Sequence, residues 1–334
     1  MPEAHGAAEA TRIEGHAASD IATNVGPTGG ERPTPHLRKL EELLTNDKLD
    51  EVDIPKVEDA LLRYQDWIAQ MSAATEVADD KVFALVDALN AYKRYIELDL
   101  IWDSAGAFLF RNRGQTKLDN SIMEEFLPWL IDPDIVPGLD SYPCEVGPHK
   151  AFAAASFEST LLQPGPGGGL RIRTKDQDFT LGRRAYLRSS FNIDFPSDGT
   201  SHHEIHLAYV AAECKTNLDK TMFQEASATA HDLRLAMPAS RYYLIAEYLD
   251  MRPISTAGTD VEEVLILRGR RMGAQMRKNN SDPKNRASTR SDYVAWLDAN
   301  PIRHTVVLRL VNHIRALFSD VDLPEEDILS RGYF

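Results

Sequence analysis

One segment, EIHLAYVAAECK from Glu204 to Lys215, constrains the fold of this chain more than any other. Its apolar residues occupy both of the faces that alternate along an extended strand. Such a strand is typical of the centre of a sheet that is covered on both sides. The segment therefore predicts an α/β (α+β) fold, in which helices flank a mixed sheet.

The surrounding sequence supplies the other elements of this sheet. Apolar and polar residues alternate in the segments 170–175 and 178–187, and short apolar runs occupy 242–246 and 264–267. Alternation with a period of two is typical of strands. A helix is expected over 220–235, immediately after the central strand. The sequence thus predicts about five strands.

The chain divides into three regions by composition and periodicity. Residues 1–35 contain no aromatic residue and are rich in Ala, Gly, Thr, Glu and Pro, which predicts a disordered tail. Residues 36–104 show apolar spacings of three and four and form a predicted helical N-terminal region. Residues 105–334 hold the expected strands, a basic loop at 268–290 and C-terminal helices. We expect this third region to be the functional domain.

Two further features lie before the strands. A helix is expected from about Asn120 to Leu130, with a kink or early stop at Pro128. The prolines and glycines between residues 133 and 148 predict a long irregular connection.

Charge and cysteine content limit the class of protein. The chain has 51 acidic and 37 basic residues, a formal net charge of −14, which argues against binding nucleic acid or anionic membranes by bulk attraction. Two cysteines cannot make a disulfide framework, and no apolar run is long enough to span a bilayer. The start of the chain lacks the pattern of a secretory signal. These features predict a soluble cytoplasmic protein.

The tripeptide Glu213-Cys214-Lys215 is the strongest chemical signal. Side chains at positions i and i+2 of a strand share a face, so Glu213 and Lys215 are expected side by side. Burying this pair is costly unless a metal ion or a reacting phosphate compensates it. A metal-dependent phosphodiesterase needs oxygen ligands for Mg²⁺, and thus a second acid near Glu213.

Hairpin geometry selects between the two acids that precede Glu213. If the second and third strands are antiparallel, the midpoint between Asp178 and Glu213 falls in the turn-forming segment 195–200. Asp178 is then opposite Glu213. Asp194 is at the turn end, roughly 30 Å away at ~3.3 Å per residue.

These residues resemble the PD-(D/E)XK nuclease superfamily, and two longer runs sharpen the resemblance. GQTKLDNSIMEEFL from Gly114 and ECKTNLDKTMFQE from Glu213 are similar to type II restriction endonucleases of the Bpu-type family. The resemblance covers about residues 105–250. One departure is that Gln177, and not proline, precedes Asp178.

The resemblance implies roles for individual residues. Asp178 and Glu213 would hold Mg²⁺, and Lys215 would position or activate the attacking water. Glu125 would support the site from the helix before the strands. Glu124 is the alternative for this role, because only one of two neighbouring residues can face inward. Gln224 would orient Lys215 or the phosphate.

The implied activity is Mg²⁺-dependent, sequence-specific hydrolysis of double-stranded DNA in a restriction system. Cutting both strands requires two active sites, so a homodimer or a second, different nuclease subunit is expected. A cognate methyltransferase would belong to the same system.

A local concentration of positive charge lies inside this acidic chain. The segment 268–290 has eight basic residues and one acid, a local charge of +7. Arginine and lysine bind phosphates, and arginine also reads guanine edges. The predicted DNA contacts are Arg268, Arg270, Arg271, Arg277, Lys278, Lys284 and Arg286. Arg111 and Arg113 could line the same groove. A solvated basic loop is the alternative.

Two other functions remain open from the sequence. One is a PD-(D/E)XK nuclease for DNA repair or structure-specific cleavage. The other is a non-enzymatic helical interaction protein, in which Glu213 and Lys215 form only an ion pair. His202, His203 and His206 are interpreted as turn-end histidines and not as a metal site, because no cysteine or acid spacing supports zinc.

Overall fold

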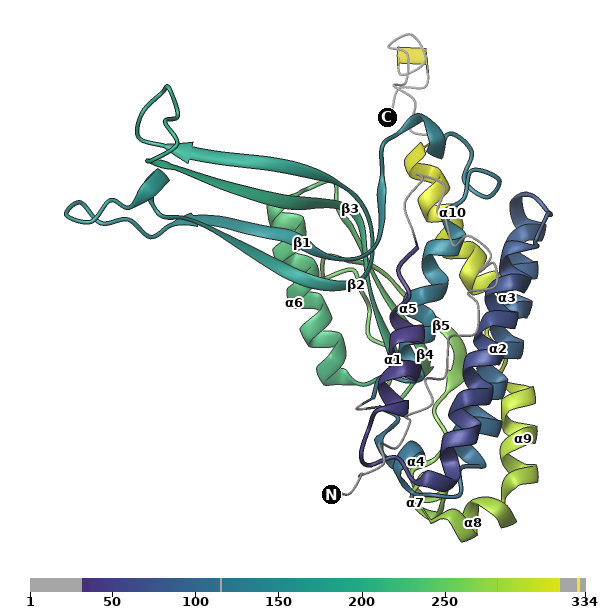
Figure 1. Ribbon diagram of the computed structural model, residues 1–334. Coiled ribbons are helices and arrows are strands. Elements are labelled where there is room, and N and C mark those ends of the chain that lie inside the picture. The colour runs from purple at the N-terminus through teal and green to yellow at the C-terminus, as the bar shows by residue number, and fades with distance from the viewer. Residues whose placement is uncertain (1–31, 115, 281, 319–328, 331–334) are drawn as a thin grey trace, which may run out of the picture.

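A computed structural model describes residues 32–114, 116–280, 282–318 and 329–330 (Figure 1). The predicted tail lies outside the described residues except for its last few positions. The first helix, α1, begins at Pro35. None of the helices in the described ranges is long and apolar enough to cross a membrane.

A five-stranded mixed sheet forms the centre of the fold, as expected. Its strands are β1 (Glu145–Phe157), β2 (Leu170–Ser190), β3 (Thr200–Leu218), β4 (Arg241–Leu249) and β5 (Val261–Arg270). They lie in chain order: β1, β2 and β3 are antiparallel neighbours, whereas β3, β4 and β5 run parallel. β3 contains the segment that predicted a central strand.

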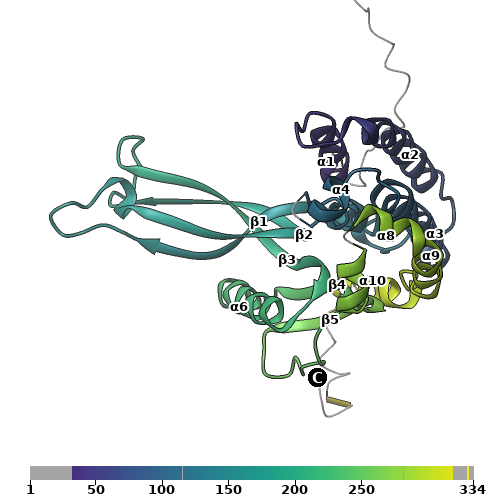
Figure 2. The same cartoon turned by 90° about the horizontal axis from the view of Figure 1, so that it is seen from below.

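The first three strands are longer than the sheet's core and extend from it as an arm (Figures 1 and 2). β2 has 21 residues, which corresponds to roughly 70 Å of extended chain. Two segments expected as separate strands, 170–175 and 178–187, are therefore one continuous strand. The arm also closes on itself at its base, where β1 pairs with β3 at Ala151 and His206.

Helices cover both faces of the sheet's core. Helix α6 (Lys220–Ala236) packs against one face, where Phe223, Ala226 and Ala230 contact small and apolar residues of the strands. Asp219 caps this helix by accepting a hydrogen bond from the Met222 backbone N–H at 2.9 Å. The remaining helices form a larger body on the other side (Figure 1).

This helical body combines both ends of the described chain. The N-terminal part contains α1 (Pro35–Leu44), α2 (Ile54–Ser72), α3 (Ala78–Tyr95), a π-helical turn (Ile96–Trp102), α4 (Phe108–Asn112) and α5 (Asn120–Phe126). The C-terminal part contains α7 (Ala274–Asn279), α8 (Pro283–Ser288), α9 (Arg290–Ala299) and α10 (His304–Phe318). Figure 2 shows α8 and α9 beside the N-terminal helices.

Pro128 acts as the sequence predicted. Helix α5 ends at Phe126, and a 3₁₀ turn over Leu127–Leu130 replaces its continuation. A proline inside the pattern removes a backbone donor and clashes with the preceding turn.

Two segments differ from expectation. The region expected to be irregular contains strand β1 from Glu145 onward, and Pro148 lies within it at a shift in register between Gly147 and His149. An edge strand tolerates a proline at a bulge, so the proline did not exclude a strand. The expected basic loop 268–290 holds the end of β5 and the short helices α7 and α8.

Candidate active site

The core end of the β2–β3 hairpin brings Asp178 and Glu213 together. Phe179 pairs with Ala212 in the antiparallel register, so the preceding Asp178 is next to Glu213 across the two strands. The Asp178 Oδ2 atom accepts a hydrogen bond of 2.8 Å from the Cys214 N–H. The hairpin register therefore agrees with the sequence argument.

Lys215 and Tyr242 both contact the carboxylate of Glu213. The Lys215 ammonium forms an ion pair with Oε1, and the Tyr242 hydroxyl donates a hydrogen bond of 2.9 Å to Oε2. Tyr242 lies on β4, which runs parallel to β3. Strand spacing thus holds the acid and the amine on one face, and a neighbouring strand fixes the orientation of the acid.

Asp178 lies where negative charge is unfavourable. Burial, followed by the nearby charge of Glu124, raises the pKa of the Asp178 carboxyl to about 6. The Cys214 N–H and the Lys117 ammonium, whose Nζ is 4.0 Å from Oδ1, oppose this rise. A bound cation would relieve the unfavourable charge.

Lys215 keeps its positive charge despite partial burial. Desolvation lowers its pKa, but the hydrogen bond and charge of Glu213 and the charge of Asp178 more than offset this, and the pKa is raised overall. The site therefore offers a fixed cation beside two carboxylates.

The structure distinguishes the two glutamates of α5. Both oxygens of Glu125 are used inside the helical body: Oε2 accepts from the His36 N–H at 2.8 Å, and Oε1 accepts from the Tyr64 hydroxyl. Glu124 instead acts electrostatically on Asp178. This corrects the expectation for Glu125, because the helix turns that side chain toward α1 and α2.

Gln224 was expected to orient Lys215 from the following helix. It lies on α6 with its side chain exposed, and among the described residues no hydrogen bond joins it to Lys215. Its neighbour Glu225 contributes to the raised pKa of Lys215. The sequence could not separate these two, since the choice depends on how α6 is rotated on the sheet.

Asp194 was the other candidate for the second acid near Glu213. It is exposed in the turn between β2 and β3 at the far end of the arm. Its N–H donates to the Asn192 side chain at 3.0 Å, within the same turn. The length of the arm separates it from Glu213.

A cavity of about 460 Å³ adjoins the end of β3, directly after Lys215. Thr216 and Asn217 contribute to its wall from the strand. Four arginines from two distant segments also line it: Arg111, Arg113, Arg271 and Arg277. Positive charge thus gathers at this cavity, which the acids Glu97 and Asp119 also line, in a protein whose net charge is negative.

Two of the expected DNA-contact residues are used inside the protein. Arg268 is buried, with Nη1 3.1 Å from Glu97 Oε2 and Nε 3.1 Å from Glu247 Oε2. Arg286 is also buried and donates to backbone oxygens of Trp102 and Ser104, both at 2.8 Å. Their expected role in DNA contact is corrected to a structural one. Sequence alone does not distinguish a buried arginine from an exposed one.

The other expected contacts are nearer to solvent. Arg270, Lys278 and Lys284 are exposed, and Arg271 and Arg277 are half-buried at the cavity. Arg271 Nη1 is 2.6 Å from Asp250 Oδ2, which fixes the direction of this guanidinium.

Comparisons with known proteins assign the chain to a class. Residues 115–334 match the family described as Bpu10I restriction endonuclease. A solved structure, the native BbvCI A2B2 tetramer at low resolution, is similar in fold, with a TM-score of 0.58 and 18% sequence identity. The similarity covers 86% of this chain and 98% of that chain. Among curated proteins, none matches.

The matched family defines a DNA-cleaving enzyme, a type II restriction endonuclease. The chain belongs to the Bpu10I restriction endonuclease family, which the match spans over about two thirds of its length. The resemblance to the Bpu-type family is thereby confirmed, and the non-enzymatic alternative is not supported.

Proposed function

We propose that this endonuclease hydrolyses phosphodiesters of double-stranded DNA with Mg²⁺, using Asp178, Glu213 and Lys215. The observation that carries the proposal is the meeting of these three side chains at the core end of the β2–β3 hairpin. Lys215 supplies the positive charge of the motif. Asp178 and Glu213 supply the carboxylate oxygens that would bind the metal ion.

The donor set fits Mg²⁺ by its chemistry. Asp178 and Glu213 offer carboxylate oxygens, the ligands that hard cations take. Asp178 carries a charge that burial disfavours, and a cation would compensate it. Bound there, Mg²⁺ would polarise the phosphate and lower the pKa of the attacking water.

The chain's own residues would act around the reacting phosphate. The ammonium of Lys215 would stabilise negative charge that develops on the phosphate oxygens. Glu213 holds this ammonium, and Tyr242 orients Glu213 through its hydroxyl. Glu124 would support the site in the role first expected of Glu125.

Plasmid digestion tests this proposal directly. With Mg²⁺, the purified chain is expected to make breaks whose sequenced ends share one short sequence, because a restriction enzyme reads bases before cutting. If a second, different subunit is needed to cut the other strand, the purified chain alone is expected to convert the plasmid to circles nicked in one strand. Unchanged cleavage in EDTA, or a preference for branched DNA over plasmid, would contradict the proposal.

We also propose that DNA enters beside the arginine-lined cavity. Replacing Arg271 and Arg277 with alanine is expected to weaken DNA binding. It should also reduce the slope of log K against log salt concentration by about 1 for each phosphate that the variant no longer neutralises. Fluorescence anisotropy over a salt series, in Ca²⁺ to prevent cleavage, measures both effects.

Arg309→Ala provides a matched control for the arginine variants. Arg309 is exposed, pairs with Glu263 at 2.6 Å and does not line the cavity. If this control and the double variant bind DNA equally, the cavity is not the DNA entry site.

We further propose that the chain acts with a second nuclease subunit or a second copy of itself. One chain carries one set of Asp178, Glu213 and Lys215, whereas a double-strand break needs two. The solved structure of similar fold is titled an A2B2 tetramer. A cognate methyltransferase and a cytoplasmic location remain part of this proposal.

A further inference from the structure

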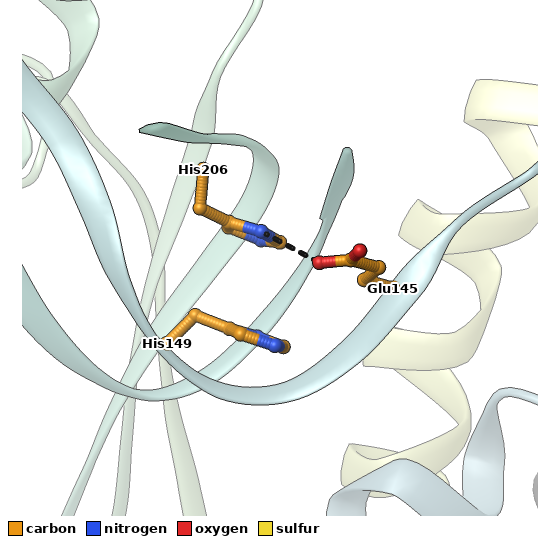
Figure 3. Close-up of side chains that lie close together, drawn as sticks. All are labelled: Glu145, His149 and His206. Carbon is orange, nitrogen blue, oxygen red and sulfur yellow. Dashed lines mark ion pairs between the residues drawn. The ribbon is translucent and has the colours of Figure 1, made fainter. Parts of the chain in front are cut away.

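A second cluster of metal-binding side chains lies outside the active site, at the base of the arm. Glu145 and His149 come from β1, and His206 comes from β3 (Figure 3). One ligand atom of each residue lies within 4.8 Å of the others. The two imidazole rings stack, with centroids 4.2 Å apart and planes 11° from parallel, and Figure 3 shows the Glu145 carboxylate facing them. Three potential ligands thus converge from two strands.

Hydrogen bonds define which nitrogen of His149 is free to bind a metal. Its Nδ1 lies 3.1 Å from the Gly147 carbonyl oxygen, which can only accept. Nδ1 therefore carries the proton, and Nε2 keeps its lone pair.

The contacts of Thr180 favour one tautomer of His206. The Thr180 hydroxyl can donate to the Gly147 carbonyl at 3.0 Å, and its oxygen then accepts from His206 Nε2 at 3.1 Å and from His149 Nδ1 at 2.8 Å. Nδ1 of His206 then keeps its lone pair. Hydrogen bonds of this kind commonly orient histidine ligands of metals.

The lone pair of His206 faces another acceptor. Nδ1 of His206 is buried, and no hydrogen-bond partner is found for it among the described residues. Glu145 Oε2 lies 3.5 Å away. In this tautomer two acceptors face each other, and a bound cation between them would stabilise the arrangement. Burial, and then the charge of His149, lowers the pKa of His206 to about 4, and burial also lowers the pKa of His149.

The surrounding side chains preserve this arrangement. The second oxygen of Glu145, Oε1, is 3.1 Å from Arg184 Nε, which leaves Oε2 directed at the histidines. Gly182 permits the close approach of β2, because a Cβ there would lie 2.4 Å from His206 Nε2. The Arg184 guanidinium opposes a cation here, and metal titration measures whether the three ligands outweigh it.

We propose that Glu145, His149 and His206 bind a divalent transition metal ion of the zinc class, separate from the catalytic site. Two imidazoles and one carboxylate suit Zn²⁺ or Co²⁺, whereas Mg²⁺ takes oxygen ligands. The ion would join β1 to β3 where the arm leaves the sheet. Its role is to fix the base of the arm, whose strand β3 also carries Glu213.

Cobalt binding tests the site without relying on activity. The full-length Asp178→Asn, Glu213→Gln double variant removes the active-site ligands and is the parent protein for all measurements. After treatment with a chelator, it is titrated with Co²⁺ and followed by visible absorption and by elemental analysis. We expect one Co²⁺ per chain, with the intense visible bands of a low-coordinate site, and displacement by Zn²⁺.

Single variants in this parent identify the ligands. His149→Gln and Glu145→Gln are each expected to weaken Co²⁺ binding at least tenfold, whereas His202→Gln, an exposed histidine on the same strand as His206, leaves it unchanged. Circular dichroism verifies that each variant is folded. No Co²⁺ in the folded parent, or equal affinity in His149→Gln and His202→Gln, would overturn the proposal and assign the cluster to a hydrogen bond between neutral His206 and the Glu145 carboxylate.

Discussion

Replacing Glu213 with glutamine is expected to reduce the rate of DNA cleavage by roughly a hundredfold or more. The substitution keeps the shape of the side chain but removes the charge that pairs with Lys215 and that would bind the metal ion. Lys215→Met is expected to cause a loss of similar size, because it removes the cation beside the phosphate. Single-turnover cleavage of plasmid at saturating Mg²⁺ measures both effects.

A matched control lies on the same strand. Glu204→Gln makes the same chemical change near the other end of β3, where Glu204 pairs with Arg184 at 3.3 Å. This variant should cut at close to the normal rate. If Glu213→Gln also retained full activity while folded, the assigned active site would be wrong.

The second large effect is expected on stability. Lys93 is fully buried, with Nζ 2.7 Å from Glu247 Oε1 and 3.4 Å from Glu97 Oε1. With Arg268, these residues form a neutral group of two cations and two anions between the π-helical turn and strands β4 and β5. Lys93→Met leaves one uncompensated buried negative charge, which costs about 3–5 kcal/mol.

Urea unfolding measures this loss as the free energy of unfolding. Lys39→Met, in an exposed pair with Glu42, is the control and should cost less than about 1 kcal/mol. Adding Glu247→Gln to Lys93→Met restores neutrality and should recover part of the loss. If Lys93→Met cost no more than Lys39→Met, the buried group would contribute nothing to stability.

The buried group also shows why the roles of its members could not be predicted from the sequence. Arg268 belongs to a basic segment by sequence, yet its guanidinium contacts Glu97, far away in the chain. The net charge of a sequence segment counts every charged residue equally, whether its side chain faces solvent or a buried acid. Only the packing of the π-helical turn against β5 separates Arg268 from the arginines at the cavity.

The local sequence pattern was sufficient to predict the central strand of the sheet and the register of the β2–β3 hairpin. The alternation around Asp178 and the apolar run that ends at Lys215 belong to adjacent strands joined by one turn. Because the side-chain period of a strand is two, the turn position alone decides which residues are opposite each other. The stop at Pro128 was equally local, since proline acts on its own helical turn.

Tertiary structure alone decided the features that depend on how separate elements pack. The rotation of α5 turns Glu124 toward Asp178 and Glu125 toward Tyr64, although the two are neighbours in sequence. His149 and His206 meet only because β1 closes onto β3 at the base of the arm. These contacts join residues dozens of positions apart, so no periodicity or spacing in the sequence encodes them directly.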